Sequence, residues 1–290
     1  MRWTDLVTDW GLDPAAMLVV ALVGGLYTQG VHRLAARGRR WSPGRSAAMA
    51  GALVAAVIAT QSGVGRHEDV RFWAHMVQHV LLGMVVPLLA VLAAPLTLAL
   101  QSARPGTRGL LRSTLHTPGA QVLTHPVVGW GLFGGGLVAL YLTPLLDLAA
   151  RQPLVHLGVH THVVLSGCLF LAPLVGVDPL PTRLPHPARL LALLAAIPFH
   201  AVVALALTSA RHPVAPETYP LLDDQRAAAA LFWGAGEVMT LVAAAIVVRQ
   251  WWVVEQRAAA RDDRRLDDER RGGRADPSDP AATDAISPAL

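Results

Sequence analysis

Seven long apolar windows constrain the fold of this chain more than any other feature of its sequence. A bilayer core about 30 Å thick requires about 20 mostly apolar residues per helical span. Only 15% of the 290 residues are charged, whereas about a quarter are charged in an ordinary globular protein. The sequence therefore predicts an all-α fold, a polytopic membrane protein with a bundle of seven transmembrane helices. The windows lie at about residues 14–35, 46–63, 70–93, 126–146, 153–175, 187–209 and 225–252.

Arginine sets the predicted orientation, because all 24 of the Lys and Arg residues are arginines. The loop at residues 33–45 is strongly basic, and so is the stretch at 104–112 after the third window. Basic loops stay in the cytoplasm. The alternate loops contain fewer arginines together with acids such as Glu68, Asp147 and Glu217. We therefore expect the N-terminus outside the cell and the C-terminus in the cytoplasm.

The chain divides into a membrane domain and a charged tail. We expect residues 1–252 to form the transmembrane domain and residues 253–290 to form a cytoplasmic tail that is disordered beyond about residue 272. That last stretch is rich in Gly, Pro, Asp and Ser and has nothing to bury. The pI of about 10.1 does not indicate a nucleic-acid partner, because the arginines lie beside spans, where lipid headgroups and topology explain them. The lipid bilayer is the expected partner of this charge.

Two histidine pairs stand out in the outer half of the predicted bundle. His75 and His79 lie in the third window, about 8 and 14 Å below its outer end, and His156 and His160 lie in the fifth window, about 5 and 11 Å down. Residues four apart share one face of a helix. Neutral imidazole is the commonest metal ligand in proteins and suits copper, zinc and iron. The spacing therefore predicts that these four histidines form one metal site.

Three further residues are candidate ligands of second rank. His200 and Glu237 lie about 15 and 18 Å below the outer ends of their spans, and ionisable groups inside a membrane usually mark a functional site. Met76 is the sulfur nearest to the histidine pairs, although a methionine in such a helix is equally typical of a core. His162 lies on a different helix face from His160, so we expect it to bond a neighbour or the backbone.

Familiar catalytic motifs are not complete in this sequence. "HEDVR" at residue 67 begins like a zinc-protease helix but has Arg71 where the second histidine is required. No GxSxG nucleophile elbow and no glycine-rich phosphate loop occur in the sequence, so neither a serine hydrolase nor a nucleotide-binding enzyme is indicated.

Four blocks of the sequence resemble a known family. They are "HMVQHVLLGMVVPLLAVLAAP" at 75–95, "HLGVHTHVVLSGCLFLAPLVGVDPLP" at 156–181, "FHAVVALAL" at 199–207 and "DQRAAAALFWGAGEV" at 224–238. Together they are similar to the CtaG-like assembly factors of bacterial caa-type cytochrome c oxidases, over roughly residues 15–252. The family's histidine blocks match His75, His79, His156 and His160, and its aspartate and glutamine at the start of the last helix match Asp224 and Gln225.

The resemblance implies a role in assembly rather than catalysis. A seven-helix protein of this kind resides in the bacterial plasma membrane and is thought to supply copper for active cytochrome c oxidase. The implied partners are oxidase subunits and an extracytoplasmic copper carrier. Monovalent copper favours thiolate and thioether ligands, whereas the four histidines supply imidazole, so copper follows from the resemblance more than from the ligands. Zinc and haem iron stay open as alternatives.

Two other functions compete with copper delivery. A haem-bearing redox protein would use one histidine from each pair as axial ligands and would leave the second histidine of each pair unexplained. A metal or proton transporter would use the buried groups as a relay. It would require polar groups that continue to the inner face, and these are sparse in the sequence.

Overall fold

The computed structural model describes residues 9–182 and 184–272, with side chains described as far as residue 267, and every regular element in these ranges is a helix. The elements are α2 (Pro14–Ala35), α3 (Pro43–Gln61), α4 (Gly63–His67), α5 (Phe72–Val80), the π-helical segment η1 (Leu81–Val85), α6 (Val86–Leu92), α7 (Pro95–Ser102), α8 (Pro105–Leu115), α9 (Pro118–Leu123), α10 (Pro126–Leu142), α11 (Leu145–Arg151), α12 (Pro153–Val175), α13 (His186–Leu194), α14 (Ile197–Ser209) and α15 (Leu222–Gly272).

The predicted all-helical membrane fold is confirmed in its main features. Six helical stretches among the described residues are long and apolar enough to cross a membrane. A seventh is obtained if α10 and α11 form one span, which is bent by 77° between them. Each predicted window falls on one of these stretches. The predicted orientation of the termini is not tested by the fold and stays a prediction.

Proline and small polar residues mark where the helices begin. Proline has no backbone N–H and has a fixed φ, so it suits the first turn of a helix, where that N–H would have no partner. Helices α2, α10 and α12 each begin at a proline. At α2 the Asp13 side chain also accepts hydrogen bonds from the N–H groups of Ala15 and Ala16. These signals explain why the sequence located the helix starts closely.

The third span contains an irregularity that the sequence did not predict. Pro87 lacks the N–H that would bond the carbonyl of Gly83 in a regular α-helix. The structure has the π segment Leu81–Val85 just before Pro87, and the N–H of Val86, which follows the segment, bonds the carbonyl of Leu81. The helix then ends at Leu92, and α7 begins at Pro95 after Ala94, which is left-handed with φ of 52°.

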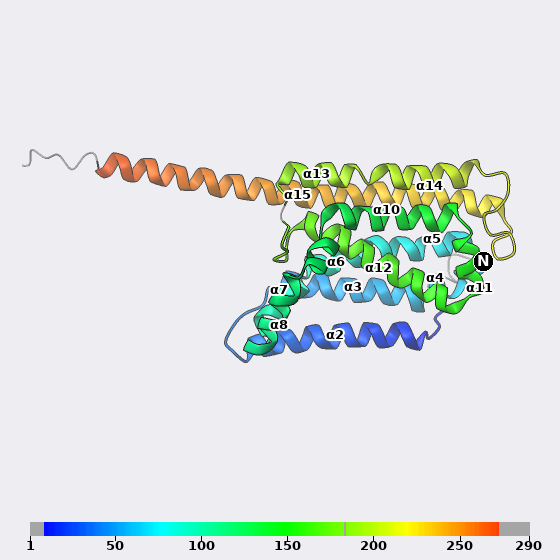
Figure 1. The fold of residues 1–290 in the computed structure, drawn as a ribbon, viewed down its shortest axis with the longest axis horizontal. Coiled ribbons are helices and arrows are strands. Elements are labelled where there is room, and N and C mark those ends of the chain that lie inside the picture. The colour runs from blue at the N-terminus through cyan, green and yellow to red at the C-terminus, as the bar shows by residue number, and fades with distance from the viewer. Residues whose placement is uncertain (1–8, 183, 273–290) are drawn as a thin grey trace, which may run out of the picture. The chain divides into compact units, whose positions relative to one another are not determined.

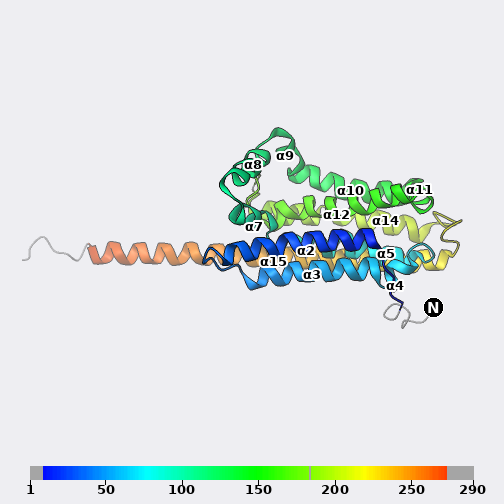
Figure 2. The same ribbon diagram turned by 90° about the horizontal axis from the view of Figure 1, so that it is seen from below.

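The main core of the bundle lies between the third span and the helices that follow it. Helix α12 packs against α10, α6 and η1, while α10 also packs against α14. In Figures 1 and 2, α2 runs along one edge of the bundle, where it packs on α3 and α7. Only Tyr27, Gly30 and Leu34 of α2 are buried. The residues that could form a site are therefore surrounded by α3, α5, α10, α12, α14 and the first part of α15.

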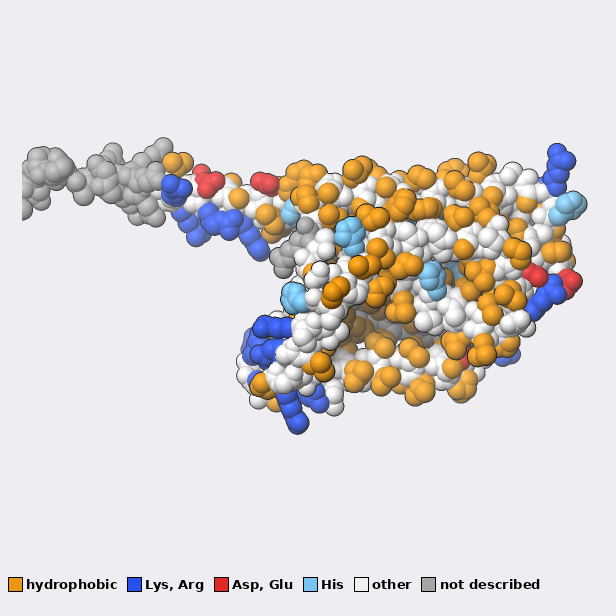
Figure 3. Space-filling model, in the orientation of Figure 1, with side chains coloured by type: hydrophobic (Ala, Val, Ile, Leu, Met, Phe, Trp, Pro, Cys, Tyr) orange, Lys and Arg blue, Asp and Glu red, His pale blue; other side chains and the backbone are white. Residues whose placement is uncertain are grey.

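Charge is distributed unevenly over the bundle. On the face shown in Figure 3, hydrophobic side chains and uncharged white atoms cover the middle of the bundle, while Lys and Arg side chains gather around α8 at one end. There Arg37 donates to the backbone of Gln101, and Arg39 donates to its side chain. Apolar flanks with charged ends are expected for a bundle in a bilayer.

The C-terminal part of α15 forms a second compact unit that begins at Val248. The predicted boundary was residue 252. The helix continues to Gly272. The stretch predicted to be disordered, beyond about residue 272, lies outside the described residues.

Candidate metal site

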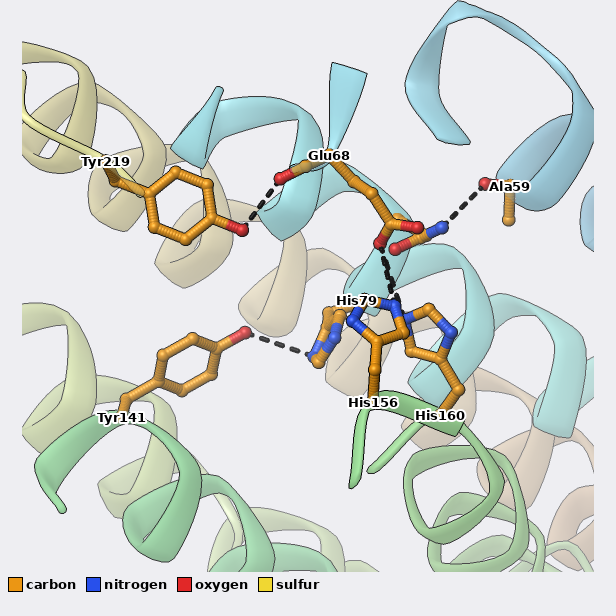
Figure 4. Close-up of polar contacts among 8 residues, drawn as sticks. Ala59, Glu68, His79, Tyr141, His156, His160 and Tyr219 are labelled. Carbon is orange, nitrogen blue, oxygen red and sulfur yellow. Dashed lines mark hydrogen bonds and ion pairs between the residues drawn. The ribbon is translucent and has the colours of Figure 1, made fainter. Parts of the chain in front are cut away.

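Glu68 and two histidines of α12 meet at the end of the bundle opposite α8. Helix α12 begins at Pro153, so His156 and His160 lie in its first two turns and share one face. Glu68 directly follows the short helix α4 and turns its carboxylate toward them, as Figure 4 shows. Its Oε2 lies 3.5 Å from Nε2 of His156 and 3.5 Å from Nε2 of His160. We call these three residues the Glu68 triad.

The spacing within the Glu68 triad suits a shared metal ion. Two ligands placed tetrahedrally about 2.1 Å from an ion lie about 3.4 Å from each other, close to the observed distances of 3.5 Å. One ligand atom from each residue lies within 4.8 Å of the other two. Oε2 of Glu68 and Nε2 of His160 are buried without a hydrogen-bond partner. Buried polar atoms are nearly always paired, so beyond their mutual contacts at 3.5 Å these atoms have capacity for a shared cation.

The Glu68 side chain is only 13% exposed, and its charge is held by its neighbours. Burial raises the pKa of the Glu68 carboxyl, but contacts with His156 and His160 outweigh burial and lower the pKa to about 2. Glu68 is therefore ionised at physiological pH. Among the described residues Glu68 forms ion pairs with histidines alone, and a histidine is charged only when it is protonated. When both rings are neutral, as metal binding requires, a bound cation would balance this carboxylate.

The second histidine pair lies directly behind the Glu68 triad. His75 and His79 of α5 are each 3% exposed, and their ring centroids are 4.1 Å apart. The rings of His79 and His160 are 5.5 Å apart, so the structure brings the two predicted pairs together. Both ring nitrogens of His75 and Nε2 of His79 are buried without a hydrogen-bond partner. The five side chains together form what we call the histidine cluster.

Tyr141 of α10 orients one ring of the histidine cluster. Its hydroxyl lies 3.1 Å from Nδ1 of His79 (Figure 4). When Nδ1 carries the proton and donates to the tyrosine oxygen, the lone pair on Nε2 is free to bind a metal. Partners of this kind fix the tautomer and direction of ligand histidines. Gln78 is buried beside them and donates from Nε2 to the carbonyl of Ala59, at 3.1 Å.

The loop before α15 holds the backbone around the cluster. The Tyr219 hydroxyl donates to the backbone carbonyl of Glu68 at 2.7 Å (Figure 4). Burial, and then the charges of Glu68 and nearby aspartates, raise the pKa of Tyr219, so it stays a donor. Oδ2 of Asp224 accepts a hydrogen bond from the N–H of Phe72, at the start of α5.

Gln225, the other residue matched through the resemblance, is fully buried and forms hydrogen bonds with the backbone before α15. Its Oε1 accepts from the N–H of Val214, and its Nε2 donates to the carbonyl of Leu207. Asp224 and Gln225 thus fix the backbone near the site, because both side chains form hydrogen bonds with backbone groups.

The candidates of second rank lie outside the histidine cluster. His200 of α14 lines a separate cavity. Glu237 accepts a hydrogen bond from Trp233 Nε1 at 3.1 Å, next to an exposed indole. Met76 is fully buried in the main hydrophobic core. His162, as expected, bonds the backbone, with Nε2 lying 3.2 Å from the carbonyl oxygen of Leu132.

Sequence reasoning missed the acid of the site. Glu68 belongs to "HEDVR", which fails as a zinc-protease motif, and it stood out only as one of several loop acids. One signal was available: Glu68 is an acid a few residues before His75, at the predicted outer end of the third span. An acid at that outer end lies close in predicted depth to His156, the outermost of the four histidines, and is a natural third ligand.

Comparisons with known proteins identify one family and three uncharacterised relatives. The family model described as cytochrome c oxidase caa3 assembly factor matches residues 25–253. An uncharacterised protein of Mycobacterium leprae is 33% identical over 244 residues, which cover 79% of this chain and 37% of that protein. Uncharacterised proteins of Mycobacterium bovis and Mycobacterium tuberculosis are each 32% identical over 246 residues, with the same shares covered. The chain thus spans just over a third of the length of these relatives. No solved structure matches the chain.

Proposed function

Because the chain belongs to the cytochrome c oxidase caa3 assembly factor family, we propose that it carries copper as cargo and delivers it to the copper centres of an oxidase. The Glu68 triad is the proposed loading site, and the observation that carries the proposal is the convergence of three ligand atoms within 4.8 Å. The role is delivery without catalysis, and the partner is an oxidase subunit in the plasma membrane.

The donor atoms of the triad suit a divalent ion. Carboxylate and imidazole bind Cu²⁺ and Zn²⁺, whereas Cu⁺ prefers sulfur. The side chains of His156 and His160 are 24% and 18% exposed, so an ion held there stays accessible to an extracytoplasmic carrier. His79 provides the next imidazole inward, with its ring 5.5 Å from that of His160. A half-buried entrance backed by a buried histidine pair suits an ion that is received and then passed on.

The packing of the rings does not favour the haem alternative. Axial histidines bind haem from opposite faces, so the macrocycle would have to lie between the two rings. The rings of His79 and His160 are 5.5 Å apart and meet edge to face, and the cavity that adjoins His79 has a volume of about 10 Å³.

The proposal is tested on the full chain purified in mild detergent. We expect His156→Ala and His160→Ala to lower the copper content measured by elemental analysis, and to lower oxidase activity in cells that depend on the variant. Protein abundance in the membrane should stay nearly unchanged, because removal of a polar ring makes a span more apolar and favours insertion.

His162→Ala is the matched control, because it lies on the same helix and bonds only a backbone carbonyl in the structure. It should retain copper and oxidase activity. The proposal fails if His162→Ala has the same effects as the two triad variants, or if the triad variants keep full copper. Wild-type protein that retains zinc and excludes copper would overturn the choice of cargo.

A further inference from the structure

Two small cavities adjoin each other along the axis of the bundle. One is lined by His79 and Phe232 among others, with a volume of about 10 Å³. The other is lined by His200, Met239 and Thr240 among others, with a volume of about 30 Å³, which is more than a single water requires. Gly83, Met84 and Phe133 line both. The second cavity, called the His200 cavity below, therefore adjoins the cavity beside His79 and shares these three lining residues with it.

His200 is held against the His200 cavity by its neighbours. Its ring packs edge-on to Phe133 at 5.7 Å and lies 5.4 Å from Phe232. A Cβ on Gly236 would come within 2.9 Å of the His200 ring, so the glycine allows the imidazole to lie directly on α15. The residue is 3% exposed. Apart from a contact with the backbone of Ala196, neither ring nitrogen has a hydrogen-bond partner, so the imidazole has capacity for a further partner in the cavity.

The walls of the His200 cavity also provide sulfur. Met84 follows the histidine pair on the third span, and Met239 comes from α15. No Asp or Glu is among the lining residues, and a divalent ion in an apolar interior without a compensating carboxylate is strongly disfavoured. Thioether and imidazole without negative charge suit Cu⁺.

We propose that the His200 cavity is a second, inner copper site, selective for Cu⁺, with His200, Met84 and Met239 as ligands. The inference rests on the proposed function in that it takes copper as the cargo, but it assigns the ion a place that the Glu68 triad does not provide. Met84 lies five residues beyond His79, about 7 Å farther along the helix. The cavity would take copper that arrives already as Cu⁺, and exchange with the divalent ion of the Glu68 triad is not part of the proposal.

The test uses the full chain in detergent, loaded with Cu⁺ under a competing chelator and examined by X-ray absorption. We expect wild-type protein to show copper–sulfur scattering. Met84→Leu and Met239→Leu should each weaken this scattering, and the double variant should remove it. Each single change should lower Cu⁺ affinity by at least about tenfold, since loss of even an outer-shell partner costs about 10- to 100-fold. The Leu replacements keep the side-chain volume, which cores tolerate well.

Met76→Leu is the control, because Met76 is a fully buried methionine of the same span that lines neither cavity. It should keep the sulfur scattering and the affinity. The inner site is overturned if wild-type protein shows no copper–sulfur scattering, or if the double variant and Met76→Leu behave alike.

The two proposals can fail separately. Loading with Zn²⁺ and Cu²⁺ reports on the Glu68 triad, and the methionine variants should leave it unchanged. Triad variants that lose divalent binding but keep the sulfur-bound Cu⁺ support the inner site independently. Divalent binding without any sulfur-bound Cu⁺ refutes the inner site and leaves the outer proposal standing.

Discussion

The Glu68 triad and the His200 cavity place histidine in two opposite surroundings. In the triad the rings of His156 and His160 are 24% and 18% exposed and face an ionised carboxylate. In the cavity the ring of His200 is 3% exposed and faces aromatic rings and thioethers. Imidazole is common to both, so the neighbouring donors decide which ion each region can hold. One bundle thereby presents a hard site near its end and a soft site in its interior.

The two surroundings also differ in how easily an ion can enter and in how firmly it is held. A site near the surface can exchange its ion with a soluble carrier, but competing water weakens electrostatic attraction there. A site surrounded by Phe133, Phe232 and methionines is shielded from bulk water and would rely on the affinity of copper for sulfur. The comparison depends on the triad lying on the extracytoplasmic side, which the distribution of arginine predicts.

Cysteine labelling of whole cells should give the largest effect, which is all or none. In a Cys168→Ser background, Glu217→Cys should react with a membrane-impermeant maleimide in intact cells, because Glu217 is 72% exposed in the loop before α15. Arg257→Cys, exposed on the C-terminal part of α15, should react only after lysis. The reverse pattern would place the triad on the cytoplasmic face and break the comparison.

Glu68→Gln should give the next largest effect, a loss of at least about 100-fold in Cu²⁺ affinity, at the upper end of what outer-shell changes cause. The change removes the negative charge of the triad but keeps the shape of the side chain and the backbone carbonyl that Tyr219 binds. Isothermal titration calorimetry of the purified protein measures the Cu²⁺ affinity, and Glu217→Gln is the matched control. Cu⁺ bound through sulfur should be unaffected, and an equal loss of both ions would mean that the two regions act as one site.

Tyr141→Phe should give a smaller effect, about tenfold on Cu²⁺ affinity, because it removes only the hydroxyl that orients His79. The variant should keep its membrane abundance. Tyr27→Phe removes a buried hydroxyl that bonds the carbonyl of Ala93 far from the site, so it controls for loss of a hydrogen bond alone. Equal copper affinity in Tyr141→Phe and wild type would show that His79 needs no orientation for binding.

Much of the fold could be predicted because a bilayer requires each helical span to have about 20 mostly apolar residues. Apolar length located every span, and prolines located several helix starts within a few residues. The helix period alone placed His75 with His79 and His156 with His160. Their approach across the bundle followed from matched depth, which depends on topology and needs no knowledge of side-chain packing.

The remaining parts of the site depend on tertiary geometry. Glu68 lies in a turn after a five-residue helix, where no period tells which way a side chain points. Tyr141 reaches His79 from a helix 62 residues away in sequence. Asp224 and Gln225 were identified only by resemblance, and their engagement with the backbone of Phe72 and Val214 emerged from the structure.

The π segment at Leu81–Val85 has a consequence for helical phase. In an uninterrupted α-helix Met84 would stand about 140° around the axis from His79, on another face. A π turn takes up about one extra residue by its end, so residues beyond Val85 are shifted by about 100° relative to an uninterrupted helix. Met84 lies inside the segment and is turned part of the way back toward the histidine face. Deleting one residue of this segment would rotate the lower part of the span by about 100° relative to the upper part, so the extra residue sets which side chains of the lower part face the same side as the histidines.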